Sequence, residues 1–102
     1  MKVELKVNDY KITNGKKNNN ILEFVDKNDN ITFDIENLIL KRENNEIETT
    51  IDFKNKKIIY ITKKENLKFN IDINIQTISC ENNKIIINYV VEKETFNLIL
   101  SY

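Results

Sequence analysis

The sequence contains no histidine, no proline and no tryptophan, and it has one glycine and one cysteine. Without histidine, the chain lacks the commonest general base, the usual partner of a nucleophilic side chain and a frequent zinc ligand. A single cysteine excludes an internal disulfide and a zinc site built on paired cysteines. A single glycine excludes a glycine-rich phosphate-binding loop. We therefore predict a protein that is not an enzyme and has no cofactor and no metal.

The chain also lacks a net charge, because 16 basic residues balance 16 acidic ones. A protein that neutralises several phosphates carries a basic surface, so nothing in this balance indicates nucleic acid as a partner. No apolar run approaches the roughly 20 residues that cross a bilayer as a helix. The first residues alternate apolar and charged, where a signal peptide would need an apolar block. We expect one domain, residues 1–102, located in the cytoplasm and not bound to a membrane.

Asparagine, isoleucine and lysine are used heavily instead. Because Asn tolerates the left-handed backbone conformation better than other residues with a Cβ, we expect it to replace glycine in turns. The longest predicted loop, residues 14–20, is polar and contains Gly15. Cys80 follows Ile78 by two positions in a strand-like run, which favours a buried, inert thiol over a reactive one.

The clearest structural signal is the alternation of apolar and polar residues from Leu67 to Gln76. Successive side chains of a strand point to opposite faces, so the pattern predicts a strand with one buried and one solvated face. The predicted buried face consists of Leu67, Phe69, Ile71, Ile73 and Ile75. Ile78 and Cys80 then occupy even positions, and this change of phase predicts a bulge near Gln76 or Thr77.

Similar short stretches recur along the whole chain and predict about eight to nine antiparallel strands. We expect the first strand to run from Val3 through Ile12, with a bulge or bend at Asn8 and Asp9. Residues 35–46 fit a helical face best, but β-branched residues and early turn signals favour a strand there too. Short regular connections predict an up-and-down meander, which hides its edges most simply when the first strand meets the last. The predicted fold is therefore all-β and closed, or nearly closed, into a barrel.

Four stretches are apolar on both faces of their predicted strands: residues 38–40, 58–61, 85–87 and 98–100. One face of each strand would fill the barrel, and the other would need a cover such as a loop, a lysine stem or a second copy. Burying one outward isoleucine is worth roughly a kcal/mol or more. A homodimer formed through the outer face is one interpretation, and scattered isoleucines left exposed by a compositional bias are the other.

Five residues are candidates for ligand binding. Arg42, Tyr60 and Tyr89 lie inside or at the end of apolar strands, where a guanidinium or phenol group needs a polar partner. Phe69 and Ile71 belong to the predicted inner face of the barrel, where a small apolar ligand would be held. Alternatively, these residues are core or rim residues whose polar groups are satisfied within the protein.

Carboxylates are the remaining groups that could perform acid–base chemistry. Asp34, Glu36, Glu48 and Asp52 alternate with core residues on neighbouring predicted strands, and a pair of them could meet at a barrel mouth. Outward polar residues on strands are ordinarily solvated. We favour that interpretation and predict no catalytic residue.

Four dispersed features of residues 21–91 resemble the YwiB-like family of small bacterial proteins of unknown function. These features are an acidic-aromatic strand at residues 22–24, an arginine before a turn at Arg42, a strand ending in Phe53, and an Ile-Asn-Tyr strand at residues 87–89. The chain differs from the family in having Glu43 and Asn44 where a glycine tends to occur, and in being shorter. The resemblance implies a calycin-like, lipocalin-like barrel and implies no activity.

Two functional hypotheses follow. The first is a non-catalytic binding module that holds a small apolar ligand in the barrel interior, lined by Leu67, Phe69, Ile71 and Tyr89. A free volume in the interior would support this hypothesis, and an interior filled by side chains would leave no site. The second is a structural or interaction protein that dimerises or docks on a partner through its apolar outer face. An enzyme ranks behind both, because it would need two acidic groups that converge in a cleft.

Overall fold

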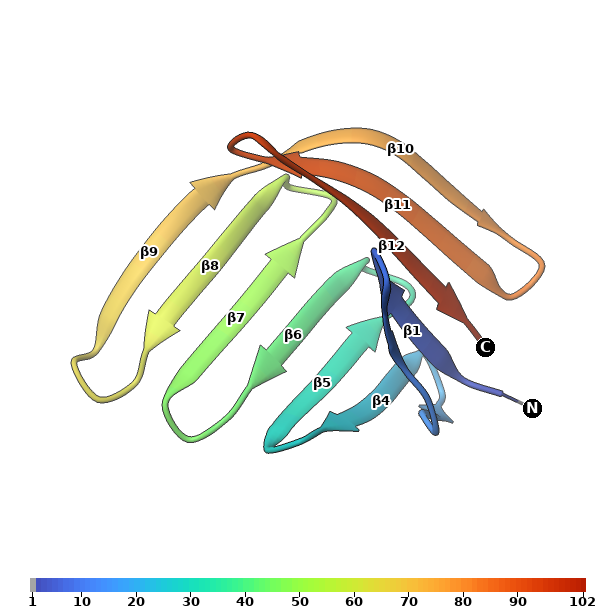
Figure 1. Ribbon diagram of the computed structural model, residues 1–102, viewed down its shortest axis with the longest axis horizontal. Helices are drawn as coiled ribbons and strands as arrows, with labels where there is room; N and C mark the ends of the chain where they lie inside the picture. The colour runs from blue at the N-terminus through green and yellow to red at the C-terminus, as the bar shows by residue number, and fades with distance from the viewer. Residues whose placement is uncertain (1) are drawn as a thin grey trace.

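The structure, a computed structural model, describes residues 2–102 and consists of antiparallel strands in two sheets. The smaller sheet has the order β10-β11-β12-β1-β2, and the larger sheet runs in sequence order from β3 to β9 (Figure 1). The strands are β1 Glu4–Val7, β2 Tyr10–Ile12, β3 Lys16–Asn18, β4 Ile21–Asp26, β5 Asp29–Asp34, β6 Ile39–Glu43, β7 Ile47–Asp52, β8 Lys57–Thr62, β9 Leu67–Asp72, β10 Asn74–Glu81, β11 Lys84–Val91 and β12 Glu94–Ser101. The prediction of an all-β, antiparallel fold is confirmed. Within residues 2–102, no helix is long and apolar enough to cross a membrane.

Neither sheet closes on itself into a barrel. The first strand does pair with the last, because Leu5 of β1 lies opposite Leu100 of β12. The circuit of hydrogen-bonded strands is interrupted at two corners, where the chain passes from one sheet to the other. At the first corner residues 13–15 connect β2 to β3, and at the second Ile73 connects β9 to β10 (Figure 1).

The strand count exceeds the predicted eight to nine because two predicted irregularities are hairpins and because the predicted long strand from Leu67 is divided at Ile73 into β9 and β10. Asn8 and Asp9 form a two-residue turn that pairs Val7 with Tyr10, so the bulge or bend predicted there is wrong. The predicted polar loop, residues 14–20, contains β3, which pairs with β4 through a similar turn. A bulge and a two-residue turn both interrupt an alternating pattern, and the pattern alone does not separate them.

Asparagine takes the turn positions, as predicted. Among residues 2–102, ten non-glycine residues have a positive φ, and six of them are asparagines: Asn8, Asn14, Asn19, Asn66, Asn82 and Asn83. Gly15 does not have a positive φ, so its role is steric. A Cβ at this position would lie 2.6 Å from Cδ2 of Phe24 and 2.8 Å from Cγ1 of Val3. Such approaches are closer than packed atoms allow, so only glycine lets the chain cross the Phe24 ring at this corner.

The core lies between the smaller sheet and the β4–β6 part of the larger sheet. Its most deeply buried side chains are Leu22, Ile31, Phe33, Phe53, Ile85, Ile87, Leu98 and Leu100. Tyr89 packs against Phe53 and Phe96, with ring centroids 5.1 Å and 5.2 Å apart. These aromatic rings fill the space between the sheets where the predicted lumen would be.

The alternating stretch that begins at Leu67 is only partly buried, which corrects the prediction. Leu67 and Phe69 are 51% and 49% exposed, Ile71 and Ile75 are half-buried, and Ile73 at the corner is buried at 6%. The Leu67 end of β9 extends beyond the smaller sheet, so nothing within residues 2–102 covers the inner side of this end. The predicted bulge is confirmed, because the pairing of β10 with β11 shifts between Ile75 and Thr77.

Cys80 is exposed, so the predicted buried thiol is wrong. It lies opposite Ile85, which is fully buried, and the two side chains share one side of the sheet. β10 is the edge strand of the smaller sheet, and its outer margin has no neighbouring strand. Its side chains therefore lose the cover that the next strand gives to Ile85.

Candidate functional site

One row of side chains crosses the inner side of the larger sheet from its buried end to its exposed end. Residues directly opposite in neighbouring strands point to the same side of a sheet. The row is Phe24, Ile31, Arg42, Thr49, Tyr60 and Phe69. Phe24 and Ile31 are buried at 3% and 2%, whereas Phe69 at the other end is half exposed.

The structure brings three of the five predicted ligand-binding residues into this row. Arg42 lies in its middle, and Tyr60 and Phe69 lie opposite each other at its exposed end. Ile71 is in the adjacent row on the same side, paired with Ile58. Tyr89 lies apart from them, in the smaller sheet, where it is 4% exposed and where burial raises its pKa to about 12. Tyr89 is therefore part of the core.

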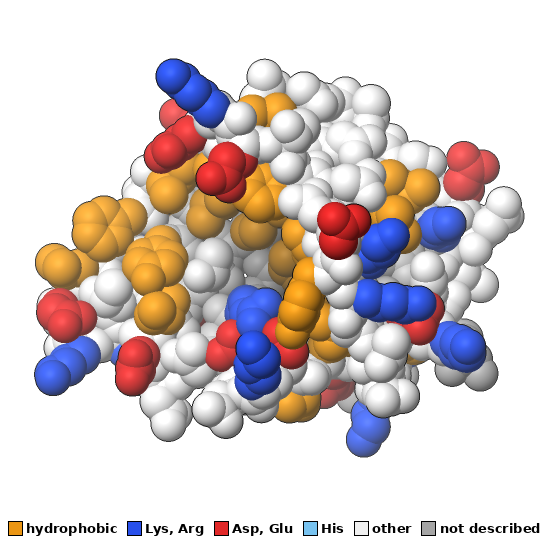
Figure 2. All heavy atoms as spheres, viewed as in Figure 1, with side chains coloured by type: hydrophobic (Ala, Val, Ile, Leu, Met, Phe, Trp, Pro, Cys, Tyr) orange, Lys and Arg blue, Asp and Glu red, His pale blue; other side chains and the backbone are white. Residues whose placement is uncertain are grey.

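We use the term open face for the exposed inner side of β7–β9, formed by Ile47, Thr49, Tyr60, Leu67 and Phe69. The rings of Tyr60 and Phe69 are 6.2 Å apart and inclined by 48°. Ile47 and Leu67 belong to a neighbouring row, each opposite Thr62. Figure 2 shows hydrophobic side chains gathered over β8 and β9 beside a hollow in the middle of the visible face. The open face is thus a largely apolar and aromatic surface that water reaches, with Thr49 and Thr62 among its apolar side chains.

A group of charged and polar side chains, here the rim cluster, borders the open face. Arg42 donates from Nε to Oδ2 of Asp29 at 2.6 Å and from Nη2 to Oδ2 of Asp26 at 2.9 Å. Asn44 donates to Oδ1 of Asp29 at 2.8 Å, and the Tyr10 hydroxyl donates to Oδ1 of Asp26 at 2.7 Å. All four carboxylate oxygens therefore accept a hydrogen bond. Because Tyr10 belongs to β2 and Asp26 to β4, the cluster also links the two sheets.

Hydrogen bonds within the rim cluster favour the charged forms of Asp29 and Arg42 and the neutral form of the Tyr10 phenol. Hydrogen bonds from Asn44 and then from Arg42 lower the pKa of the Asp29 carboxyl. Burial alone would lower the pKa of Arg42, but hydrogen bonds to Asp29 and Asp26 outweigh it and raise the pKa. The hydrogen bond to Asp26 raises the pKa of Tyr10. With two carboxylates around one guanidinium, the cluster has no unengaged positive charge to offer an anionic ligand.

A hollow of about 230 Å³ separates the rim cluster from the open face and is bordered by both. Its lining is Asp29, Arg42, Glu43, Asn44, Ile47, Thr49 and Tyr60. Sites for drug-sized ligands usually measure about 300–1,000 Å³. The hollow is therefore suited to one ring or a short aliphatic group, with the remainder of a ligand lying on the open face.

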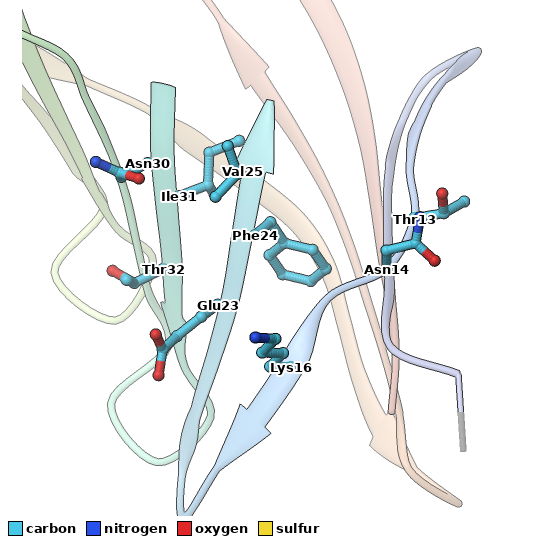
Figure 3. A pocket seen from close by; sticks show the side chains of 9 residues that line it. All are labelled: Thr13, Asn14, Lys16, Glu23, Phe24, Val25, Asn30, Ile31 and Thr32. Atoms are coloured by element: carbon cyan, nitrogen blue, oxygen red, sulfur yellow. The ribbon is translucent and has the colours of Figure 1, made fainter. Parts of the chain in front are cut away.

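A second hollow, of about 430 Å³, lies at the corner where β3 leaves β4. In Figure 3 the Phe24 ring points towards Thr13 and Asn14, and Glu23 and Thr32 point away from it. The charged residues of its lining are Lys16 and Glu23, which lie opposite each other in paired strands. None of the five predicted ligand-binding residues lines this hollow, and its polar groups do not converge on one point.

The four carboxylates considered for acid–base chemistry have structural partners. Asp34 accepts hydrogen bonds from the backbone of Glu36 and Asn37, and these bonds shape the turn before β6. Asp52 accepts hydrogen bonds from Asn55 in the next turn, and Glu48 pairs with Lys41 at 2.8 Å. Glu36 accepts one from Asn20 at 3.1 Å. Residues 2–102 contain no group of three or more acidic, Cys or His side chains that could hold a metal ion.

Sequence reasoning missed the partners of Arg42. Asp26 and Asp29 flank a two-residue turn between β4 and β5, and in the sequence they resemble ordinary turn residues. Asp26 and Asp29 lie opposite each other across this turn, so both carboxylates lie on the inner side of the larger sheet. The signal was the lone arginine, whose need for a polar partner was recognised without the partner being identified.

Comparison with known proteins adds no assignment to this geometry. The chain matches no protein-family model, no curated protein and no solved structure. The resemblance to the YwiB-like family accordingly stays a prediction, and the function is argued from the described surfaces.

Proposed function

We propose that this chain is a non-catalytic, cytoplasmic binding module that holds an uncharged apolar molecule on its open face. The observation that carries the proposal is the exposure of Phe69 and Leu67, 49% and 51%, beside the Tyr60 ring. Both side chains lie on the side of the sheet that forms the core elsewhere. Contiguous exposed apolar surface on a soluble domain is a mark of a binding site.

The open face is favoured over the interior as the place of binding. Between the sheets, Phe53, Tyr89 and Phe96 pack against one another and occupy the predicted lumen. The hollow of about 230 Å³ lies instead at the border of the open face and shares Tyr60 with it. A ligand with one ring in this hollow would cover Phe69 and Leu67 with its remaining apolar surface.

The rim cluster supports an uncharged ligand. Each carboxylate oxygen of Asp26 and Asp29 already accepts a hydrogen bond, and Arg42 donates to both residues. An anionic ligand placed against this cluster would lose hydration without gaining a free donor, and a charged group on the apolar part of the open face would lose hydration there too. The cluster serves to fix the margin of the open face and to hold β2 against β4.

Docking through the outer face remains the second candidate function. The outward isoleucines Ile39, Ile59, Ile61, Ile86 and Ile99 are half-buried. Ile59 lies between Thr50 and Asn70 in its row, whereas Ile86 and Ile99 lie directly opposite each other. The outer face thus presents single and paired aliphatic side chains, whereas the open face combines two neighbouring aromatic rings with the strongly exposed Leu67.

The kinship with lipocalin-like barrels is part of the proposal. It is supported by the pairing of β1 with β12 and by chain continuity at both corners, which leave a circuit with two gaps in its hydrogen bonding. We propose that the fold is a flattened, opened form of such a barrel. This form would explain why the ligand surface lies at the margin of the core.

The test combines a neutral fluorescent probe with one variant and one control. N-phenylnaphthylamine, which brightens on apolar surfaces, should bind the protein, and Phe69→Ser should weaken binding about tenfold or more. Val25→Ser is the matched control, because Val25 is 69% exposed on the outer side of β4. Native mass spectrometry of protein from its own source should also show a retained small molecule. Equal probe binding by wild type and Phe69→Ser would contradict the proposal.

A further inference from the structure

We propose that the β9 strands of two copies of this chain pair antiparallel, around a two-fold axis at Asn70, and join the two larger sheets. This inference goes beyond the proposed function, because ligand binding on the open face does not require it. It rests on the free edge of β9, on the direction of its backbone groups and on the order of charges along it.

The two sheets have four edge strands, β2, β3, β9 and β10. β2 and β3 contain three residues each, and β10 carries a bulge between Ile75 and Thr77. Short edges and bulges are the usual means of preventing edge-to-edge association. β9 has six residues in unbroken register with β8, and Figure 1 shows it at the margin of the molecule without a further strand beside it. β9 is therefore the edge that lacks these protections.

The backbone groups of every second β9 residue are directed to this free edge. Ile73 donates its amide to the Lys56 carbonyl at 3.1 Å, on the side of β8. In an antiparallel pair, residues with hydrogen bonds to the neighbour alternate with residues whose groups face away. The amides and carbonyls of Lys68, Asn70 and Asp72 consequently point outwards, where a second strand would bond them.

The charges on β9 select one register for a symmetric pair. Interfaces with a two-fold axis bring the same surface of each copy together. An axis at Lys68 or at Asp72 would place like charges directly opposite, which destabilises a sheet. An axis at Asn70 places Lys68 of each copy opposite Asp72 of the other. An axis at Phe69 or at Ile71 would leave Lys68 and Asp72 opposite uncharged residues, so only the axis at Asn70 makes β9 complementary in charge to itself, and this complementarity favours a second copy as the partner.

The same register also matches the apolar side of β9. With the axis at Asn70, Phe69 of each copy lies opposite Ile71 of the other. Pairs of an aromatic and a β-branched residue are favourable cross-strand neighbours. Because Phe69 is 49% exposed and Ile71 half-buried in the single chain, pairing removes apolar surface from water. The two open faces would then adjoin on one side of the joined sheet.

The test exchanges charges at the two positions. Lys68→Glu and Asp72→Lys each place like charges opposite one another twice in the dimer, and each should weaken self-association at least about tenfold. In an equimolar mixture of the two variants, the introduced glutamate faces the introduced lysine, and the native Lys68 faces the native Asp72. The mixture should therefore form a heterodimer, as measured by sedimentation velocity and native mass spectrometry.

Lys64→Glu is the control for Lys68→Glu. It makes the same change of net charge, but in the turn before β9, outside the pairing residues. It should dimerise as the wild type does. The proposal is overturned if the wild type stays monomeric up to its solubility limit, if each single variant dimerises like the wild type, or if mixing does not restore the dimer. Probe binding by a monomeric variant would leave the proposed function intact, so the two proposals fail separately.

Discussion

The β4–β6 and β7–β9 parts of the larger sheet have the same pairing and the same alternation, yet they differ in what covers them. Ile31 of β5 and Phe69 of β9 belong to one cross-strand row, and they are 2% and 49% exposed. The smaller sheet packs over the first part, whereas in the second part only residues such as Ile51 and Ile58 reach the core, and Leu67 and Phe69 of β9 are left uncovered. An alternating pattern therefore specifies which side of a strand is apolar, and the opposing layer determines whether that side becomes core or surface.

The energetic contrast between the two parts is the largest effect that we predict. Phe33→Ala in the covered part should lower the free energy of unfolding by about 3–5 kcal/mol, because it leaves a cavity in packed surroundings. Phe69→Ala in the open part should cost less than about 1 kcal/mol, as is usual for surface substitutions. Urea denaturation followed by circular dichroism measures both values. Equal losses would show that β9 is covered in solution.

At the corner beside the covered part, Gly15→Ala should cost about 1–3 kcal/mol, as overpacking of a core does. The added methyl would press on the Phe24 ring and on Val3, which the glycine now allows to approach. Asn14→Gly is the control, because Asn14 has a φ of 61°, which glycine adopts readily. Thermal unfolding of both variants measures the two changes in stability. An unchanged melting temperature for Gly15→Ala would contradict the steric role of Gly15.

At the border between the two parts, Arg42→Leu should lower stability by about 1 kcal/mol. It removes the hydrogen bonds to Asp26 and Asp29 and leaves these two carboxylates opposite each other. Since both side chains are near water, the loss should shrink at high salt, which screens like charges. A loss that does not depend on salt would indicate that Arg42 acts by packing alone.

The smallest predicted effect concerns pH and the turn before β6. Hydrogen bonds from the backbone and side chain of Asn37 lower the pKa of Asp34 in the folded state. This stabilisation is fully present above the ordinary Asp pKa of about 4 and is lost as pH falls through the lower folded value. Asp34→Asn should therefore lose part of the stability at neutral pH and show a weaker decrease below about pH 4. If Asp34→Asn unfolded in acid with the same profile as the wild type, Asp34 would not stabilise the turn through its ionised carboxylate.

Local features of the fold could be predicted from the sequence. Alternation located most strands, and the change of phase after Gln76 located the bulge between Ile75 and Thr77. The use of asparagine in turns also follows from its backbone preferences, and Asn8, Asn19 and Asn66 illustrate it. These features depend on neighbouring residues and on a single strand, so a single sequence is enough to predict them.

Features that depend on distant parts of the chain were not predictable in the same way. The end of the smaller sheet decides that Phe69 is exposed and that Ile73 is buried, although both belong to one alternating run. The bonds of Arg42 to Asp26 and Asp29 require the register of three strands. The candidate site was found in part, because Arg42, Tyr60 and Phe69 share a row, while Tyr89 belongs to the core of the other sheet.

Hydroxyl-radical footprinting read by mass spectrometry tests the difference between the two parts most directly. It reports the solvent exposure of individual aromatic side chains, and it should be applied to the dilute Lys68→Glu variant, so that pairing of β9 does not mask Phe69. Phe69, which is 49% exposed, should react at a substantial fraction of its rate in the unfolded chain, while Phe33 and Phe53 should be strongly protected. Protection of Phe69 to the same degree as Phe33 would contradict the open face.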